Sequence, residues 1–337
     1  MEIAVEGAEA SSWLRRCVDL LASVLPRGVD IAESGPNRVI VNGTAVRLAW
    51  AGDGWLPDVR RVLAAADRPE IVGAHRMSPG ARAELLAAGI GWADETGAAE
   101  IAIGPIIVVR PGLVGSSRPR SAGWTAATEA VAEALLCGTA PTVDTVAEAT
   151  GLSTGSCVVG LRSLTDLGLL TSDAGRGRSS GRRLDNRDRL LDAYAAAAAA
   201  RRRPPSIRVG VTWRDVVEGT IAAGRAWTAT GIAWAATGVV ASEVIAPHLT
   251  NVNRADVYIA GRSLTDLARA ATAAGLRPVE GGRLQLLAFP TTATSRLIEQ
   301  VGEMMVAPWP RVFADLRESG VRGEDVAEHL REIRHGR

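Results

Sequence analysis

The sequence predicts a multidomain α+β protein: a small N-terminal α/β domain, a central winged helix-turn-helix and a mixed C-terminal α/β domain. The chain has 337 residues, more than the roughly 100–150 of a typical domain. Segments with helical and strand periodicity alternate along it. A stretch rich in Pro, Gly, Ser and Arg at 112–122 is typical of a linker. The expected domains are therefore 1–111, 123–186 and 187–337.

Composition indicates a globular cytoplasmic protein. Apolar residues make up 47% of the chain and charged residues 22%, enough to build several cores. The three cysteines are isolated, which argues against a disulfide framework and a zinc site. The N-terminus lacks the pattern of a signal peptide, and the apolar segment 226–241 is shorter than the roughly 20 residues of a membrane span. We expect no membrane contact, no metal and no cofactor.

The N-terminal domain is expected to alternate helices and strands. Apolar residues recur at helical spacing over 9–25. Asn42-Gly43 is a strong hairpin signal between two strand-like runs. The expected helices are 9–25, 57–66 and 79–86, and the expected strands are 38–41, 44–50, 70–74, one near Trp92 and the last over 101–109.

This order of elements is similar to the core of restriction-endonuclease-like folds. Those nucleases place an Asp on one strand and Glu-x-Lys on the next, to bind a divalent metal and activate water. Here Asp53 precedes Glu70-Ile71-Val72, so that valine stands where the lysine would be, and the chain contains no lysine at all. We expect a degenerate or unrelated domain and no enzyme activity. The alternative is a DNA-processing protein, either a nuclease or a reader of modified DNA.

The central segment has the pattern of a winged helix. Gly151 ends the second of three short helical stretches, and Ser153 is placed to cap the third. A loop that alternates Gly, Ser and Arg follows, as expected of a wing. The helices are expected at 124–137, 144–150 and 153–167, and the wing at 171–183.

The third helix is expected to read DNA. At about 100° per residue, one set of side chains packs on the other helices: Cys157, Val158, Leu161, Leu164 and Thr165. The opposite side carries Gly155, Ser156, Val159 and Ser163, with Arg162 at its flank. Small side chains allow close approach to base edges, Val159 can touch a thymine methyl, and Arg162 can contact guanine.

Positive charge is concentrated around the wing. Residues 162–208 contain 11 arginines and 5 acidic residues, whereas the whole chain has a formal net charge of only +1. Such a local field attracts nucleic acid. A protein-interaction scaffold built on the winged helix remains an alternative. The candidate DNA-binding residues are Ser153, Thr154, Ser156, Val159, Arg162, Ser163, Arg176, Arg178, Arg182 and Arg183.

The C-terminal domain mixes strands and helices. The hexapeptide Arg-Ser-Leu-Thr-Asp-Leu occurs at both 162–167 and 262–267. Its flanks do not match, so we interpret it as a chance similarity of two capped helices. Helices are expected at 184–203, 219–241 and 264–274, and strands at 209–213, 256–260 and 283–289.

Several blocks of residues together resemble a known family. They are Met77-Ser-Pro79, Gly89-Ile-Gly-Trp92, Asp94-Glu-Thr-Gly97, Gly224-Arg-Ala-Trp-Thr-Ala229 and Pro308-Trp-Pro-Arg-Val-Phe-Ala-Asp315, with its continuation to Leu330. With the winged helix among them, these blocks resemble the AbiEi-type antitoxins of type IV toxin–antitoxin systems over about residues 70–332. The last block is the most specific.

The resemblance implies a DNA-binding transcriptional regulator that represses its own operon. By position, the DNA-reading helix of the family corresponds to Ser153–Ser163 and its wing to Arg176–Arg183. The family implies duplex DNA of the protein's own promoter as partner. It also implies a nucleotidyltransferase-like toxin, countered without a stable complex. A homodimer is left open.

Overall fold

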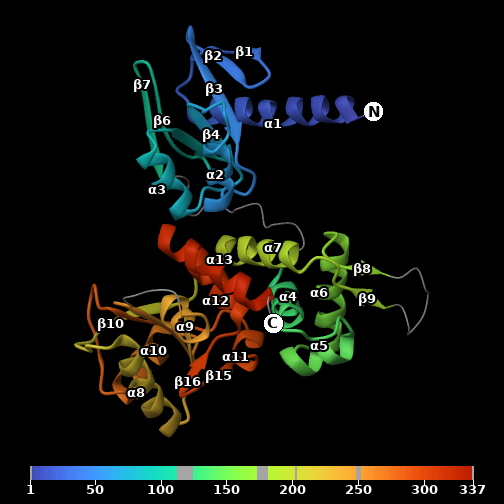
Figure 1. Cartoon of the computed structure of the whole chain (residues 1–337). Helices are drawn as coiled ribbons and strands as arrows, with labels where there is room; N and C mark the ends of the chain where they lie inside the picture. Colours follow the sequence, from blue (N-terminus) through green and yellow to red (C-terminus); the bar gives the residue numbers. More distant parts are fainter. Residues whose placement is uncertain (1, 112–123, 173–180, 202, 248–251, 336–337) are drawn as a thin grey trace. The chain divides into compact units, whose positions relative to one another are not determined.

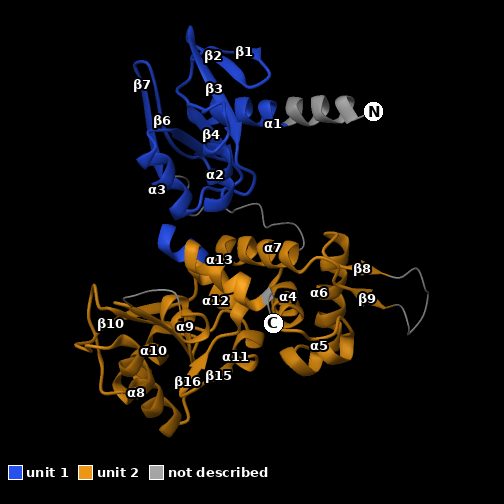
Figure 2. Ribbon diagram, viewed as in Figure 1, with its two compact units in different colours: residues 1–118, 317–324 blue, residues 119–316, 325–337 orange. Residues whose placement is uncertain are grey.

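The computed structural model describes residues 2–111, 124–172, 181–201, 203–247 and 252–335, and side chains from residue 13 to 334 within these ranges. The chain is a mixed α+β protein with two compact units (Figure 2). Unit 1 comprises residues 1–118 and 317–324, and unit 2 residues 119–316 and 325–337. The linker expected at 112–122 lies outside the described residues.

Unit 1 is built on a seven-stranded sheet whose strands follow one another in chain order. β3, β4 and β5 are parallel, and the other neighbours are antiparallel. Asn42-Gly43 joins β2 to β3 as expected. β1 was not expected from the sequence. The strands are β1 (Ile31–Gly35), β2 (Arg38–Val41), β3 (Thr44–Trp50), β4 (Ile71–Ala74), β5 (Gly91–Asp94), β6 (Ala98–Ile103) and β7 (Ile106–Pro111).

Helices cover both faces of this sheet. Leu14, Cys17 and Leu21 of α1 (Glu2–Val24) are buried in one apolar cluster with alternate residues of the strands. A second cluster joins the sheet to α2 (Leu56–Leu63) and α3 (Pro79–Ala87). Successive residues divide between the two clusters, because side chains along a strand point to opposite faces. Ile71 belongs to the first and Val72 to the second.

Unit 2 begins with four helices and a short hairpin (Figure 1). α4, α5 and α6 pack against one another, and α7 packs on α4. Each corresponds to a helix expected from the sequence. Their bounds are α4 (Ala126–Leu136), α5 (Val143–Thr150), α6 (Thr154–Asp166), β8 (Thr171–Ser172), β9 (Arg182–Arg183) and α7 (Arg187–Ala200).

A second seven-stranded sheet forms the rest of unit 2, in the order β13-β10-β14-β12-β11-β16-β15. Three helices, α8, α9 and α10, pack on its strands. The strands are β10 (Ser206–Gly210), β11 (Trp234–Thr237), β12 (Ala255–Ile259), β13 (Arg277–Pro278), β14 (Leu284–Ala288), β15 (Glu299–Val301) and β16 (Met304–Val306). The remaining helices are α8 (Val216–Ala229), α9 (Gly238–Ile245), α10 (Leu264–Ala273), α11 (Thr292–Arg296), α12 (Trp309–Arg317) and α13 (Val321–His335).

The single helix expected over 219–241 is wrong. α8 ends at Ala229, and all four residues of β11 are buried as an inner strand between β12 and β16 before α9 begins. The segment is apolar throughout, and such a run does not distinguish a buried helix from a buried strand. Gly224 of α8 leaves the space that the Trp234 ring fills, since a Cβ there would lie 2.0 Å from the ring.

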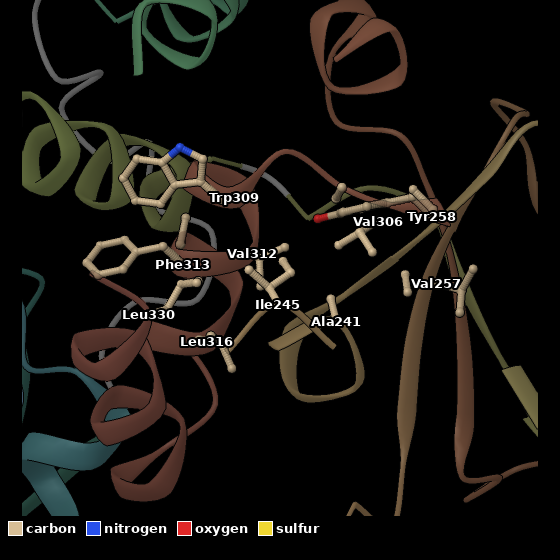
Figure 3. Close-up of a cluster of buried hydrophobic side chains, with 14 of the residues drawn as sticks. Ala241, Ile245, Val257, Tyr258, Val306, Trp309, Val312, Phe313, Leu316 and Leu330 are labelled. Atoms are coloured by element: carbon tan, nitrogen blue, oxygen red, sulfur yellow. The ribbon is translucent and has the colours of Figure 1, made fainter. Parts of the chain in front are cut away.

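One apolar cluster joins the sheet of unit 2 to its C-terminal helices and to α4–α7. Figure 3 shows part of it, with Val257 and Val306 of the sheet, Ile245 of α9, and Trp309 and Phe313 of α12. Within the described ranges, no helix combines the length and apolar character needed to cross a lipid bilayer.

Candidate nucleic-acid interface

The three helices α4, α5 and α6 each begin at a hydroxyl residue. The side chains of Thr125, Thr142 and Ser153 accept hydrogen bonds from backbone N–H groups three residues later, at 3.1, 3.4 and 3.2 Å. Such N-caps satisfy donors that a helix start otherwise leaves free. The sequence therefore fixes where each helix begins, and only Gly151, Leu152 and Ser153 separate α5 from α6.

Side chains of α7 and α11 hold these helices in place. Arg296 of α11 donates to the backbone carbonyls of Glu148 and Ala149 at the end of α5, at 3.1 and 3.4 Å. Glu133 of α4 is fully buried and accepts hydrogen bonds from Tyr194 and Thr294, both at 3.0 Å. Burial raises the pKa of Glu133 to about 7, against the opposing effect of these donors and of Arg311.

The buried side of α6 is centred on a glycine that the sequence did not single out. A Cβ at Gly160 would lie 2.7 Å from Cγ2 of Val131 on α4, so the two helices approach closely there. Cys157, Leu161 and Leu164 are buried beside it, as expected.

Because of this contact, the buried and exposed sides of α6 differ from the expected ones. Val158, expected on the packed side, is 43% exposed, and Thr165 is only half-buried. Arg162, expected at the flank, lies in the middle of the exposed side with Gly155 and Val159. Val159 itself is exposed as expected, at 55%. Periodicity alone gave no weight to Gly160, because a glycine has no apolar side chain to count.

Two of the hydroxyl groups expected to contact DNA form hydrogen bonds within the protein. Ser153 and Ser156 lie 3.0 Å apart through their Oγ atoms, and Ser153 also caps the helix. Ser163 is half-buried, whereas Thr154 is exposed in the first turn. The side chains on the exposed stripe are therefore mainly Val158, Val159 and Arg162.

The hairpin that follows α6 carries two of the expected arginines. β8 and β9 pair antiparallel, with Arg183 opposite Thr171 and Arg182 opposite Ser172. Arg183 forms an exposed ion pair with Asp185, 2.6 Å from Nε to Oδ1. Arg176 and Arg178 lie outside the described residues.

Sequence reasoning missed one further cation near α6. Arg189 of α7 is exposed, and one of its terminal nitrogens lies 3.7 Å from the place of a Cβ on Gly168, just after α6. The sequence signal that could have indicated Arg189 was the run of arginines that continues beyond the wing. Two other arginines of this run have structural partners: Arg187 donates to the carbonyl of Leu136, and Arg201 pairs with Glu129 at 2.6 Å.

The structure does not bring together the two carboxylates of the nuclease hypothesis. β3 and β4 are parallel, and Asp53 follows the end of β3 whereas Glu70 precedes the start of β4, so they lie at opposite ends of this pair. Glu70 also binds Arg47, whose guanidinium lies 3.0 Å away. Burial opposes ionisation of Glu70, but the hydrogen bonds from Arg47 outweigh it and lower the pKa.

Another pair does meet where the parallel strands end, the edge where open α/β sheets bind ligands. His75 follows β4, Glu95 follows β5, and Nδ1 lies 2.8 Å from Oε2. Both side chains are exposed, at 42% and 47%. Among the described residues, no three His, Cys, Asp or Glu side chains lie close enough together to hold a metal ion.

Comparison with models of protein families, with curated proteins and with solved structures found no match to this chain.

Proposed function

We propose that this protein is a transcriptional regulator that binds duplex DNA through α6 and the β8–β9 hairpin. The observation that carries the proposal is the two-sided character of α6. One side is buried on α4 and α5, and the other presents Val158, Val159 and Arg162. Three helices, a three-residue turn before the third and a hairpin after it support a winged helix-turn-helix, whose third helix would enter the major groove.

The exposed stripe of α6 has a defined chemistry for base edges. The methyl groups of Val158 and Val159 fit the thymine methyl, and a guanidinium at Arg162 fits O6 and N7 of guanine. Arg162 has only a loose contact with Asp166, 3.9 Å between side chains that are 78% and 71% exposed. An exposed ion pair of this kind contributes little to stability, so Arg162 can leave Asp166 to contact DNA.

Phosphate contacts would set affinity and register rather than sequence preference. The first backbone N–H groups of α6, at Thr154 and Gly155, suit a phosphate because the helix dipole favours an anion there. Arg182 and Arg183 add positive charge in the hairpin that follows the other end of α6, and Arg176 and Arg178 belong to the same proposed wing. Their contribution should weaken as salt rises.

The test is a binding titration with two duplexes, the DNA upstream of the protein's own coding sequence and a scrambled version, each at two salt concentrations. Tighter binding to the upstream DNA is expected. Arg162→Ala should weaken binding to that DNA by roughly 1–3 kcal/mol and leave the scrambled duplex nearly unaffected, because it removes a base contact.

Arg262→Ala is the matched control. Arg262 is exposed and begins the second copy of the hexapeptide that Arg162 begins. The control should bind both duplexes like the wild type. Equal losses in the two variants, or no preference for any duplex selected from a random pool, would contradict the proposal.

The resemblance stated above supports a narrower form of the proposal, an autorepressing antitoxin-like protein. If an adjacent gene encodes a nucleotidyltransferase-like toxin, coexpression with the present chain should restore growth. Arg162→Ala should release repression of the operon. We expect growth to be rescued although size-exclusion chromatography detects no stable complex of the two proteins.

The same titration tests the enzyme alternative. Parallel samples with Mg²⁺ should leave the DNA intact, because Asp53 and Glu70 lie at opposite ends of the β3–β4 pair. Cleavage that requires Mg²⁺ and is lost in Asp53→Ala would support a nuclease instead. Binding to no DNA at all would favour a protein-interaction scaffold.

A further inference from the structure

The starts of α2 and α3 in unit 1 share one acceptor that comes from far along the chain. α2 follows Trp55, whose side chain makes no cap hydrogen bond, so the first turn lacks the oxygen that an N-cap usually supplies. The acceptor is instead Glu324, at the start of α13. Residues 317–324 belong to unit 1, although the residues on either side of them belong to unit 2.

Three donors converge on the Glu324 carboxylate. Oε2 accepts from the backbone N–H of Leu56 at 2.6 Å. Oε1 accepts from the Ser78 hydroxyl at 2.5 Å and from the backbone N–H of Gly80 at 3.1 Å. The residue is only 1% exposed. Two helix N-termini therefore aim their positive ends at one buried anion.

The surrounding residues fit this group closely. A Cβ on Gly80 would lie 2.4 Å from Oε1 of Glu324, so any larger residue there would displace the carboxylate. The Arg317 guanidinium, which lies over the Trp55 ring at 4.6 Å, adds a nearby positive charge. Ser78 meanwhile caps α3 by accepting from the N–H of Ala81 at 3.1 Å. The site is thus formed by the starts of α2 and α3 and by two buried side chains, Ser78 and Arg317.

We propose that unit 1 contains a carboxylate-binding site, formed by Leu56, Ser78 and Gly80, whose resident occupant is Glu324 and which accepts a free monocarboxylate in its place. A small carboxylate would then compete with Glu324 for these three donors. This inference does not depend on DNA binding.

The geometry favours a carboxylate over a phosphate. The two carboxylate oxygens use all three donors: Oε1 accepts two hydrogen bonds and Oε2 accepts one. A phosphate would bury further oxygens with no donor among these three, and an unsatisfied buried oxygen is costly.

The experiment uses the full chain with Glu324→Ala and sodium acetate as the probe, against equal concentrations of sodium chloride. Hydrogen exchange of α2 and α3 is measured at pH 8, because burial raises the pKa of Glu324 and the acid form must be avoided. Exchange should be on the order of 30-fold faster than in wild type, since about 2 kcal/mol of hydrogen bonding is lost. Acetate at ten times its dissociation constant should restore about tenfold of that protection.

Gly80→Ala in the Glu324→Ala background is the matched control, because its added methyl fills the carboxylate position; acetate should no longer protect it. Glu332→Ala changes an exposed glutamate of the same helix and should not respond to acetate. Wild type should respond only at far higher acetate, because its own carboxylate competes. Sodium phosphate should not replace acetate.

Equal protection by acetate and chloride in Glu324→Ala would overturn the proposal, and so would equal acetate protection in the double variant. If Glu324→Ala does not fold without acetate, it is purified with acetate, which is then dialysed away. Loss of structure on dialysis supports the site. A variant that stays unfolded even in acetate, while Glu324→Gln folds, overturns it. Protection by phosphate equal to that by acetate would overturn the assignment to carboxylates.

Discussion

The hexapeptide Arg-Ser-Leu-Thr-Asp-Leu has two different structures in unit 2. At 162–167 it forms the last turns of α6, and at 262–267 it forms the start of α10. The first copy continues a helix that Ser153 has already capped, and Gly168, with φ 66°, ends it. The second follows β12 and Gly261, with φ 155°, so Ser263 becomes an N-cap.

The difference shows that flanking residues decide where a helix begins and ends. The two leucines exchange roles as a result. Leu164 is fully buried and Leu264 is 57% exposed, whereas Leu267 is fully buried and Leu167 only partly so. Equal local sequence therefore predicts equal helical propensity but not equal burial.

The largest expected effect comes from the first leucine of each copy. Leu164→Ala should destabilise the protein by roughly 2–5 kcal/mol, because it leaves a cavity among α4, α5 and α6. Leu264→Ala should change stability by less than about 0.5 kcal/mol, since that side chain is largely in water. Urea unfolding of both variants measures the contrast. Similar losses would mean that the two helices bury the same face.

The serines should give a smaller contrast. The Ser263 hydroxyl accepts from the N–H of Asp266 at 3.2 Å, so Ser263→Ala should cost about 1 kcal/mol. Ser163 lies within α6, where alanine is the better helix former, so Ser163→Ala should be neutral or slightly stabilising. Thermal unfolding of the two variants measures this difference in stability. A greater loss at Ser163 would contradict the assigned helix starts.

The aspartates should differ least, and only as a function of pH. Asp266 accepts hydrogen bonds from the N–H groups of Arg262 and Ser263 and from the Ser263 hydroxyl, and these lower its pKa. Its charge should therefore stabilise the folded state above the ordinary pKa of about 4, and this contribution should fade as the pH falls through the lowered value.

The measurement is the melting temperature of Asp266→Asn and Asp166→Asn between pH 7 and pH 3. Asp266→Asn should melt below the wild type at pH 7 and approach it at low pH. Asp166 is 71% exposed near the end of α6, so Asp166→Asn should follow the wild type throughout. A constant gap for Asp266→Asn would show that its charge is not what stabilises α10.

Local signals in the sequence were enough to predict most elements. Caps such as Ser153 and the Asn42-Gly43 turn act through neighbouring residues, so the sequence places them directly. The orientation of α6 was not predictable, because it depends on Gly160 meeting Val131 of another helix. β11 was missed because its apolar residues fit a buried helix equally well. The acceptor for α2 could not be found locally, since it lies 268 residues further along.

The long stretch of chain between Glu324 and its partners in unit 1 has a consequence for biosynthesis. The sheet of unit 1 and its helices α2 and α3 lie within residues 31–111, yet the N–H groups of Leu56 and Gly80 await an oxygen made 268 and 244 residues later. Domains generally fold as they emerge during synthesis. Here unit 1 is completed only after the intervening residues 119–316 of unit 2 have been made.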